Sequence, residues 1–170
     1  MECTASAGRL RIVRRAALAM LTCTLLAGVG WAQEIIVQNG ASAPVKITAG
    51  EIAAMPHRRA TVESHGKRVS YEGVPLASLL EKAGVRFGET LRGKRLATYL
   101  LAEAADGYRV VFALPELDPA FTDHVILLAD RADGHPLDNK EGPFRIVVPD
   151  AKRMARSVRE VTALKILQAP

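Results

Sequence analysis

The chain has 170 residues, of which 49% are hydrophobic and 24% are charged, and its formal net charge is +5. This length is enough for one domain with a core, and the mixed composition excludes a disordered or fibrous protein. The first 32 residues hold four arginines and one glutamate. Without them Lys+Arg falls from 23 to 19, Asp+Glu falls from 18 to 17, and the net charge is about +2. We therefore predict no nucleic-acid binding.

Residues 1–32 have the order of a secretory signal peptide. The arginines precede an apolar run over about residues 16–27, and Gly30 and Ala32 then supply a small-x-small pattern. We predict cleavage after Ala32, a periplasmic location, and a single domain over residues 33–170 with no membrane span. The alternative is an uncleaved membrane anchor, which the short apolar run disfavours.

Both cysteines, Cys3 and Cys23, lie within this predicted signal peptide. The mature chain would contain none, and an exported protein without cysteine has no disulfides. It also has no thiolate for nucleophilic chemistry or for a metal ion.

The first predicted elements are strands over residues 35–38 and 45–47. Thr48 and Glu51 have the spacing of a capping box, which predicts a short helix that Pro56 ends.

Strands over 60–63 and 68–71 lead to the clearest helix, written GVPLASLLEKAG. Pro75 suits the first helical position, and Gly84 suits the position after the last turn. The apolar residues spaced for one buried face are Leu76, Leu79, Leu80 and Ala83.

The remaining elements are predicted to be strands, over residues 95–104, 108–114, 124–129, 144–148 and 161–167. Asp106 and Gly107 are typical of a tight turn between the first two. Arg145 is expected on the outer face of its strand. Many short strands with few short helices predict an α+β fold with a β-rich mixed sheet, without the alternation of a Rossmann domain.

Four stretches in this order resemble the molybdopterin-binding domain of the sulfite-oxidase type, in its small exported bacterial form. They are YEGVPLASLLEKAG, DGYRVVFALPEL, DGHPLDNKEGPFRIVVP and RSVREVTALKI. The resemblance covers about residues 48–167. It implies a sulfite-oxidase-type fold and a pyranopterin cofactor, molybdopterin, that carries molybdenum in the oxidoreductases of the family.

In catalytic members of the family the metal takes one cysteine thiolate, from a motif that resembles Thr-x-x-Cys-x-Gly. The matching stretch here is TVESHG, in which Thr61 and Gly66 match and Ser64 stands at the ligand position. The resemblance implies a cofactor site at Ser64 and His65 without the thiolate, so molybdenum is not expected. Ligation of molybdenum by serine and a solvated strand end are the alternatives.

The Ser64–His65 pair also invites a hydrolase interpretation. Adjacent residues on an extended strand point to opposite faces, so His65 is badly placed to act as a base for Ser64. We therefore do not predict a hydrolase.

Two arginine-bearing stretches are further candidates for the cofactor site. Arg58 and Arg59 precede the strand of Ser64, and arginine suits the phosphate that the resemblance implies on the cofactor. Tyr108 and Arg109 follow the predicted turn. If Arg58, Arg59 and Arg109 face one pocket, that pocket should bind phosphate-bearing ligands. The alternatives are a solvated loop for the first pair and a plain hairpin turn for the second.

The four histidines, at positions 57, 65, 124 and 135, have no i, i+4 partner among them, so zinc is not predicted.

Three hypotheses for function remain open. The first is an exported binding module, or an accessory to a redox system, that takes an anionic pterin or another small ligand and works with a redox partner protein. The second is an active molybdopterin-dependent oxidoreductase with an atypical site. The third is a structural or interaction domain without a small ligand.

Overall fold

The computed structural model describes residues 33–64 and 66–170, so the predicted signal peptide and His65 lie outside the described residues. The strands in chain order are β1 (Glu34–Asn39), β2 (Val45–Thr48), β3 (Arg58–Ser64), β4 (Lys67–Pro75), β5 (Thr98–Ala104), β6 (Arg109–Ala113), β7 (Leu127–Ala132), β8 (His135–Pro136), β9 (Arg145–Val147) and β10 (Val161–Gln168). The helices are α1 (Ala49–Ala53) and α2 (Leu76–Lys82), with 3-10 turns η1 (Gly88–Thr90), η2 (Gly93–Ala97), η3 (Leu114–Leu117) and η4 (Met154–Arg156).

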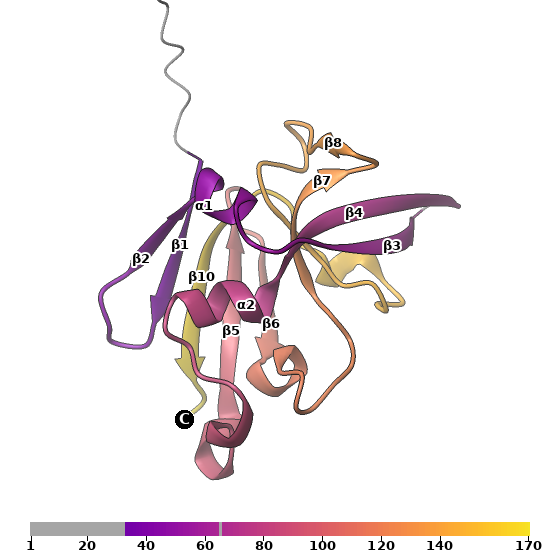
Figure 1. Cartoon of the computed structure of the whole chain (residues 1–170). Helices are drawn as coiled ribbons and strands as arrows, with labels where there is room; N and C mark the ends of the chain where they lie inside the picture. The colour runs from indigo at the N-terminus through magenta and orange to yellow at the C-terminus, as the bar shows by residue number, and fades with distance from the viewer. Residues whose placement is uncertain (1–32, 65) are drawn as a thin grey trace, which may run out of the picture.

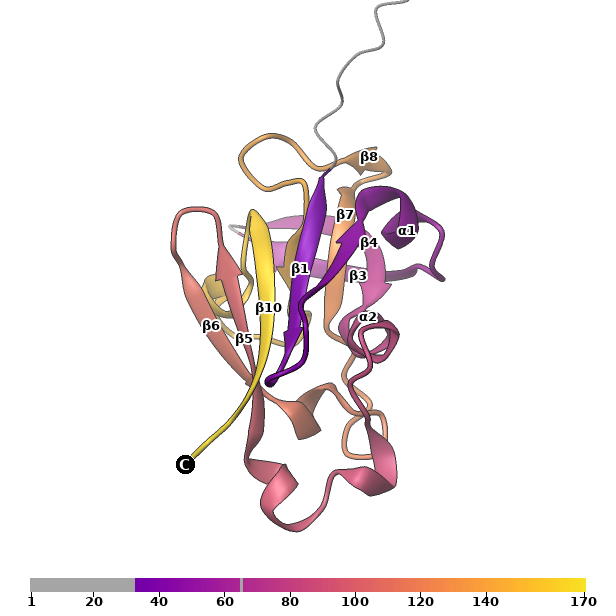
Figure 2. The same ribbon diagram turned by 90° about the vertical axis from the view of Figure 1, so that its left-hand side faces the viewer.

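These strands form two sheets of five strands each (Figure 1). Sheet A has the order β2-β1-β10-β5-β6, in which only β1 and β10 are parallel. Sheet B has the order β3-β4-β7-β8, and β9 also pairs with β7. β3 and β4 run across the direction of the sheet A strands in both Figure 1 and Figure 2. The predicted β-rich mixed architecture is confirmed.

The main core lies between sheet A, helix α2 and one face of sheet B. Strand alternation brings Leu100, Ala102 and Ala104 of β5 to this side. A smaller apolar cluster covers the other face of sheet B, and its members are Val62, Tyr71, Leu127, Ala129 and Val147. The part of sheet B where β9 pairs with β7 is therefore buried on both faces, which matters for the site described below.

Both predicted helices are present. Thr48 Oγ accepts from the Glu51 amide and the Glu51 carboxylate accepts from the Thr48 amide, so the capping box is confirmed. α2 begins at Leu76, one residue later than predicted, and Gly84 follows it with φ of 82°. Within the described residues no helix has the length and apolar character needed to cross a membrane.

Two predicted strands begin three residues too early. The strand predicted from residue 95 begins at Thr98, because residues 93–97 form the 3-10 turn η2. The strand predicted over 124–129 runs over Leu127–Ala132. The carbonyl of Ile126 instead accepts from the Leu76 amide at 2.9 Å, which ties this loop to the start of α2.

β4 and β7 approach each other closely at Gly73, because glycine has no Cβ atom. A Cβ atom added to Gly73 would lie 2.2 Å from the Leu128 carbonyl oxygen and 2.4 Å from the Ala129 Cα. Both atoms are backbone and cannot move aside by a change of rotamer. We predict that Gly73→Ala destabilises the protein by about 3 kcal/mol, at the upper end for overpacking.

Urea unfolding of the purified protein measures this loss. Gly50→Ala is the matched control, because an added Cβ there meets nothing within 4 Å and the residue is helical. An equal unfolding midpoint for Gly73→Ala and the wild type would contradict the packing described for β4 and β7.

Candidate functional site

A pocket of about 720 Å³ opens where sheet B meets the β5–β6 turn and the chain that precedes β10. We name it the Arg145 pocket. Its charged and aromatic lining residues are Lys67, Arg145, Arg159, Asp106, Glu141, Tyr71 and Tyr108. The volume lies in the range of roughly 300–1,000 Å³ that is usual for small-molecule sites.

Arg145 forms the buried wall of this pocket. It lies on β9, opposite Ala129 of β7, and is only 7% exposed. Its guanidinium carbon is 5.0 Å from the centroid of the Tyr71 ring, and its Nη1 donates to Glu141. Its Nε is buried and has no hydrogen-bond partner in the part of the chain that the structure describes. The charge is thus partly compensated and keeps unused donor capacity.

The prediction that Arg145 lies on an outer face was therefore wrong. The alternation of β9 does direct Arg145 away from the main core, but the second cluster covers that face of sheet B as well. Val147, two residues further on and 0% exposed, lies in this cluster. An apolar residue at that spacing was the sequence signal for a strand buried on both faces.

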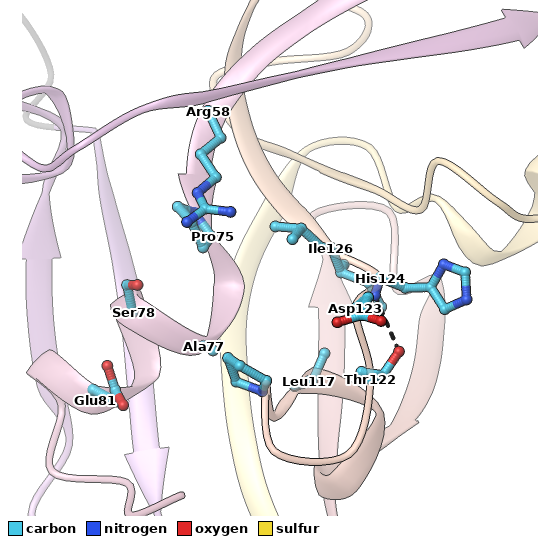
Figure 3. Close-up of a pocket in the computed structure, with 12 residues that line it drawn as sticks. Arg58, Pro75, Ala77, Ser78, Glu81, Leu117, Thr122, Asp123, His124 and Ile126 are labelled. Atoms are coloured by element: carbon cyan, nitrogen blue, oxygen red, sulfur yellow. Dashed lines mark hydrogen bonds between the residues drawn. The ribbon is translucent and has the colours of Figure 1, made fainter. Parts of the chain in front are cut away.

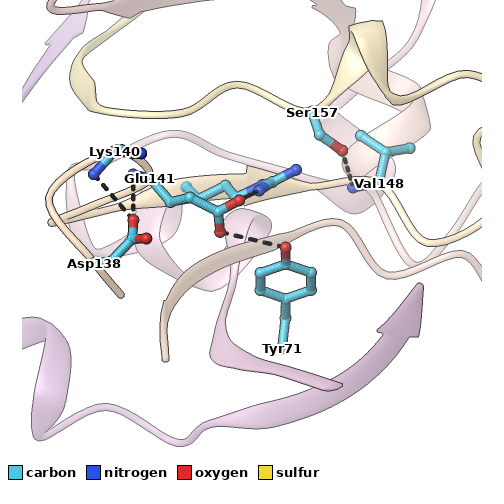
Figure 4. A network of polar contacts seen from close by, with 7 residues as sticks. Tyr71, Asp138, Lys140, Glu141, Val148 and Ser157 are labelled. Atoms are coloured by element: carbon cyan, nitrogen blue, oxygen red, sulfur yellow. Dashed lines mark hydrogen bonds and ion pairs between the residues drawn. The ribbon is translucent and has the colours of Figure 1, made fainter. Parts of the chain in front are cut away.

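Glu141 is held in place by the turn that precedes β9. The amides of Lys140 and Glu141 both donate to Asp138 Oδ1, at 2.9 and 3.0 Å (Figure 4). The Glu141 carboxylate then accepts from Arg145 and from the Tyr71 hydroxyl, the latter at 3.3 Å. A short backbone motif thus positions the carboxylate that accepts from both Arg145 and Tyr71.

Tyr71 covers the guanidinium from β4 and is 4% exposed. Burial raises the pKa of its hydroxyl above the usual value of 10.0. Arg145 acts against this rise, and Glu141 adds to it. Below that raised pKa the hydroxyl is neutral and can donate to the carboxylate.

The opposite wall of the pocket is the β5–β6 turn. Gly107 has φ of 84°, and Asp106 Oδ1 accepts from the Tyr108 amide at 2.8 Å, so the predicted hairpin turn is confirmed. The Tyr108 hydroxyl donates to the Ala155 carbonyl oxygen at 2.6 Å. This bond ties the turn to the η4 segment, while the ring remains 45% exposed beside the pocket.

The predicted ligand position pairs with a residue that lines the same pocket. Ser64 is the last residue of β3 and pairs with Lys67, which lines the pocket. Of the predicted site residues Ser64 and Tyr108, Tyr108 lines the pocket, and Ser64 is the strand partner of the lining residue Lys67. Their roles toward a cofactor stay predictions, as does the role of His65.

The three candidate arginines do not share a pocket. Arg58 lines a different recess. Arg59 pairs with Glu72 at 2.6 Å, and Arg109 pairs with Glu103 at 3.0 Å on the outer side of sheet A. The single phosphate pocket that these arginines would have formed is absent from the described structure, and Arg145 is the buried arginine that the sequence analysis missed.

Comparison with known proteins identifies the family. A family model described as oxidoreductase molybdopterin binding domain matches residues 31–170, and the chain belongs to this family. The crystal structure of the sulfane dehydrogenase SoxCD from Paracoccus pantotrophus is similar, with a TM-score of 0.62 and 23% sequence identity. The match covers 80% of this chain but only 38% of the SoxCD chain. No curated protein has a matching sequence. The predicted sulfite-oxidase-type molybdopterin-binding fold is confirmed.

The raised pKa of Tyr71 predicts how stability changes at alkaline pH. Above the unfolded pKa near 10.0 the unfolded chain loses this proton while the folded protein retains it. The folded state then binds more protons, so stability falls as pH rises through this window. We expect Tyr71→Phe to remove part of that fall.

Urea unfolding at a series of pH values from neutral to above 10 measures the slope for both proteins. The same alkaline slope in wild type and Tyr71→Phe would show that Tyr71 does not hold its proton in the folded state.

Proposed function

We propose that the Arg145 pocket binds an anionic small ligand, either a phosphate-bearing pterin of the kind the family is named for or a molecule of similar size and charge. We further propose that the protein acts in the periplasm as a binding module or redox accessory, with a redox partner protein, and holds no molybdenum.

The observation that carries the proposal is the buried guanidinium of Arg145 with unused donor capacity in a pocket of suitable size. Lys67 and Arg159 add positive charge to the lining. Tyr71 and Tyr108 add aromatic surface, which suits a planar ring. The chemistry of this lining fits an organic anion.

The same residues do not fit the metal. The sequence has cysteine only at positions 3 and 23, and serine stands at position 64 where the family resemblance implies the thiolate. Among the described residues that line the pocket, sulfur is present as the thioether of Met154. Soft metal centres favour thiolate ligands, and a serine hydroxyl holds its proton far more tightly than a thiol.

The second candidate is an active molybdopterin-dependent oxidoreductase in which Ser64 replaces the thiolate. The observation in its favour is that Ser64, at the end of β3, pairs with Lys67, which lines the pocket. The dehydrogenase activity named for SoxCD belongs to that protein, and this chain would need a bound metal to perform chemistry of that kind. A domain without a small ligand is the third candidate.

Metal and pterin analysis separates these candidates. We expect protein made in a host with intact molybdenum-cofactor synthesis to carry little or no molybdenum and to show no sulfite oxidation or sulfoxide reduction. Ser64→Cys should raise the molybdenum content above that of the wild type if the pocket accepts the complete cofactor. Elemental analysis and the fluorescence of released, oxidised pterin provide the two readouts.

Each outcome points to one candidate. Pterin without metal supports the binding module, and neither component favours a domain without a ligand. Stoichiometric molybdenum in the wild type that is lost in Ser64→Ala would make the protein an enzyme with a serine ligand.

A further inference from the structure

A second recess lies between the start of β3, helix α2 and the loop that leads into β7 (Figure 3). Its volume is about 260 Å³, and we name it the Arg58 recess. Arg58 enters it from β3, Glu81 belongs to α2, and Asp123 lies on the loop. It shares no lining residue with the Arg145 pocket.

The floor of this recess is apolar. Leu117 and Ile126 are buried there, and Pro75 and Ala77 are half-buried beside them. The volume is below the roughly 300–1,000 Å³ of sites for drug-sized ligands. A ligand that fills this recess would be small and would carry an apolar part.

Three charged side chains around the recess have no oppositely charged partner within the described part of the protein. Arg58, Glu81 and Asp123 are exposed and form no ion pair among the residues that the structure describes. Figure 3 shows the Arg58 guanidinium beside Pro75, with Glu81 and Asp123 on different sides of the recess.

The charged residues next to these three in the sequence do form ion pairs. Arg59 pairs with Glu72, and Lys82 pairs with Glu51. His124 turns away from the recess (Figure 3) and pairs with Asp150 at 2.6 Å. The unpaired charges around the Arg58 recess thus contrast with the ion pairs that their chain neighbours form.

One cation and two carboxylates that face the same apolar floor match a ligand that carries both signs of charge. We propose that the Arg58 recess binds a small zwitterion, a free α-amino acid with an aliphatic side chain. The carboxylate of the ligand accepts from the Arg58 guanidinium, whose planar fork suits carboxylates. The ammonium group donates to Asp123, and Glu81 adds negative charge from the side of α2. The aliphatic side chain packs on Leu117 and Ile126.

This site is independent of the proposed anion site. Arg58 pairs with Gly73 at one end of β3, whereas Ser64 pairs with Lys67 at the other end. A strand of this length spans roughly 20 Å. Failure of amino-acid binding would therefore leave the pterin proposal intact, and the reverse also holds.

L-leucine is the probe, measured by saturation-transfer NMR and by calorimetric titration of the purified protein. Because the charged side chains are exposed, we expect saturable but weak binding. L-leucinamide lacks the carboxylate and N-acetyl-L-leucine lacks the ammonium group. Both should bind at least about tenfold more weakly than L-leucine, since each loses its contact with a charged group.

Arg58→Gln and Asp123→Asn should each weaken L-leucine binding by about tenfold. Arg59→Gln is the matched control, because Arg59 is the next residue on β3, lines neither pocket and pairs with Glu72. It should leave binding unchanged. The proposal is overturned if L-leucine does not bind, if either blocked analogue binds as well as L-leucine, or if Arg58→Gln binds like the wild type.

Discussion

A guanidinium that is removed from water loses a large solvation energy, which the surrounding groups must replace. Arg145 is in this position, because β9 is covered on both faces and leaves the side chain 7% exposed. Glu141 supplies the opposite charge, and the ring of Tyr71 covers the guanidinium at 5.0 Å. The buried Nε has no partner among the described residues. An anionic ligand in the pocket would complete this compensation, which links the stability of the site to its proposed function.

The fold brings the Arg145 guanidinium together with side chains from three separate parts of the chain. β4 supplies Tyr71, the turn before β9 supplies Glu141, and the β5–β6 turn supplies Tyr108. The Tyr108 hydroxyl bonds to Ala155, and the Glu160 amide donates to the Glu141 carbonyl oxygen at 3.0 Å. The walls are thus joined by hydrogen bonds between loops. β7 pairs with β4 along one edge and with β9 along the other, and so holds both strands in place.

Much of the fold could be predicted from interactions between residues that are close in the sequence. The capping box at Thr48, helix α2 and the Asp106–Gly107 turn each depend on a few neighbouring residues, and all are present. The burial of Arg145 could not be predicted in this way, because it depends on a second apolar cluster assembled from β3, β4, β7 and β9. The separation of Arg58 from Arg59 follows from strand alternation, whereas the distant position of Arg109 required the pairing of β5 with β6. The cofactor role predicted for Ser64 rests on family resemblance rather than on a local sequence pattern.

The central claim is that Arg145 anchors an anionic ligand. Fluorescence titration of the purified protein with a pterin that carries a phosphate group tests it directly, using Arg145→Lys and the control Arg109→Lys. Lysine keeps the charge but loses the planar fork, so Arg145→Lys should bind about tenfold more weakly. Arg109→Lys should bind the pterin like the wild type. Added salt should weaken pterin binding by the wild type and by Arg109→Lys. Equal affinity for the wild type and a folded Arg145→Lys variant, or no binding by the wild type, would contradict the account.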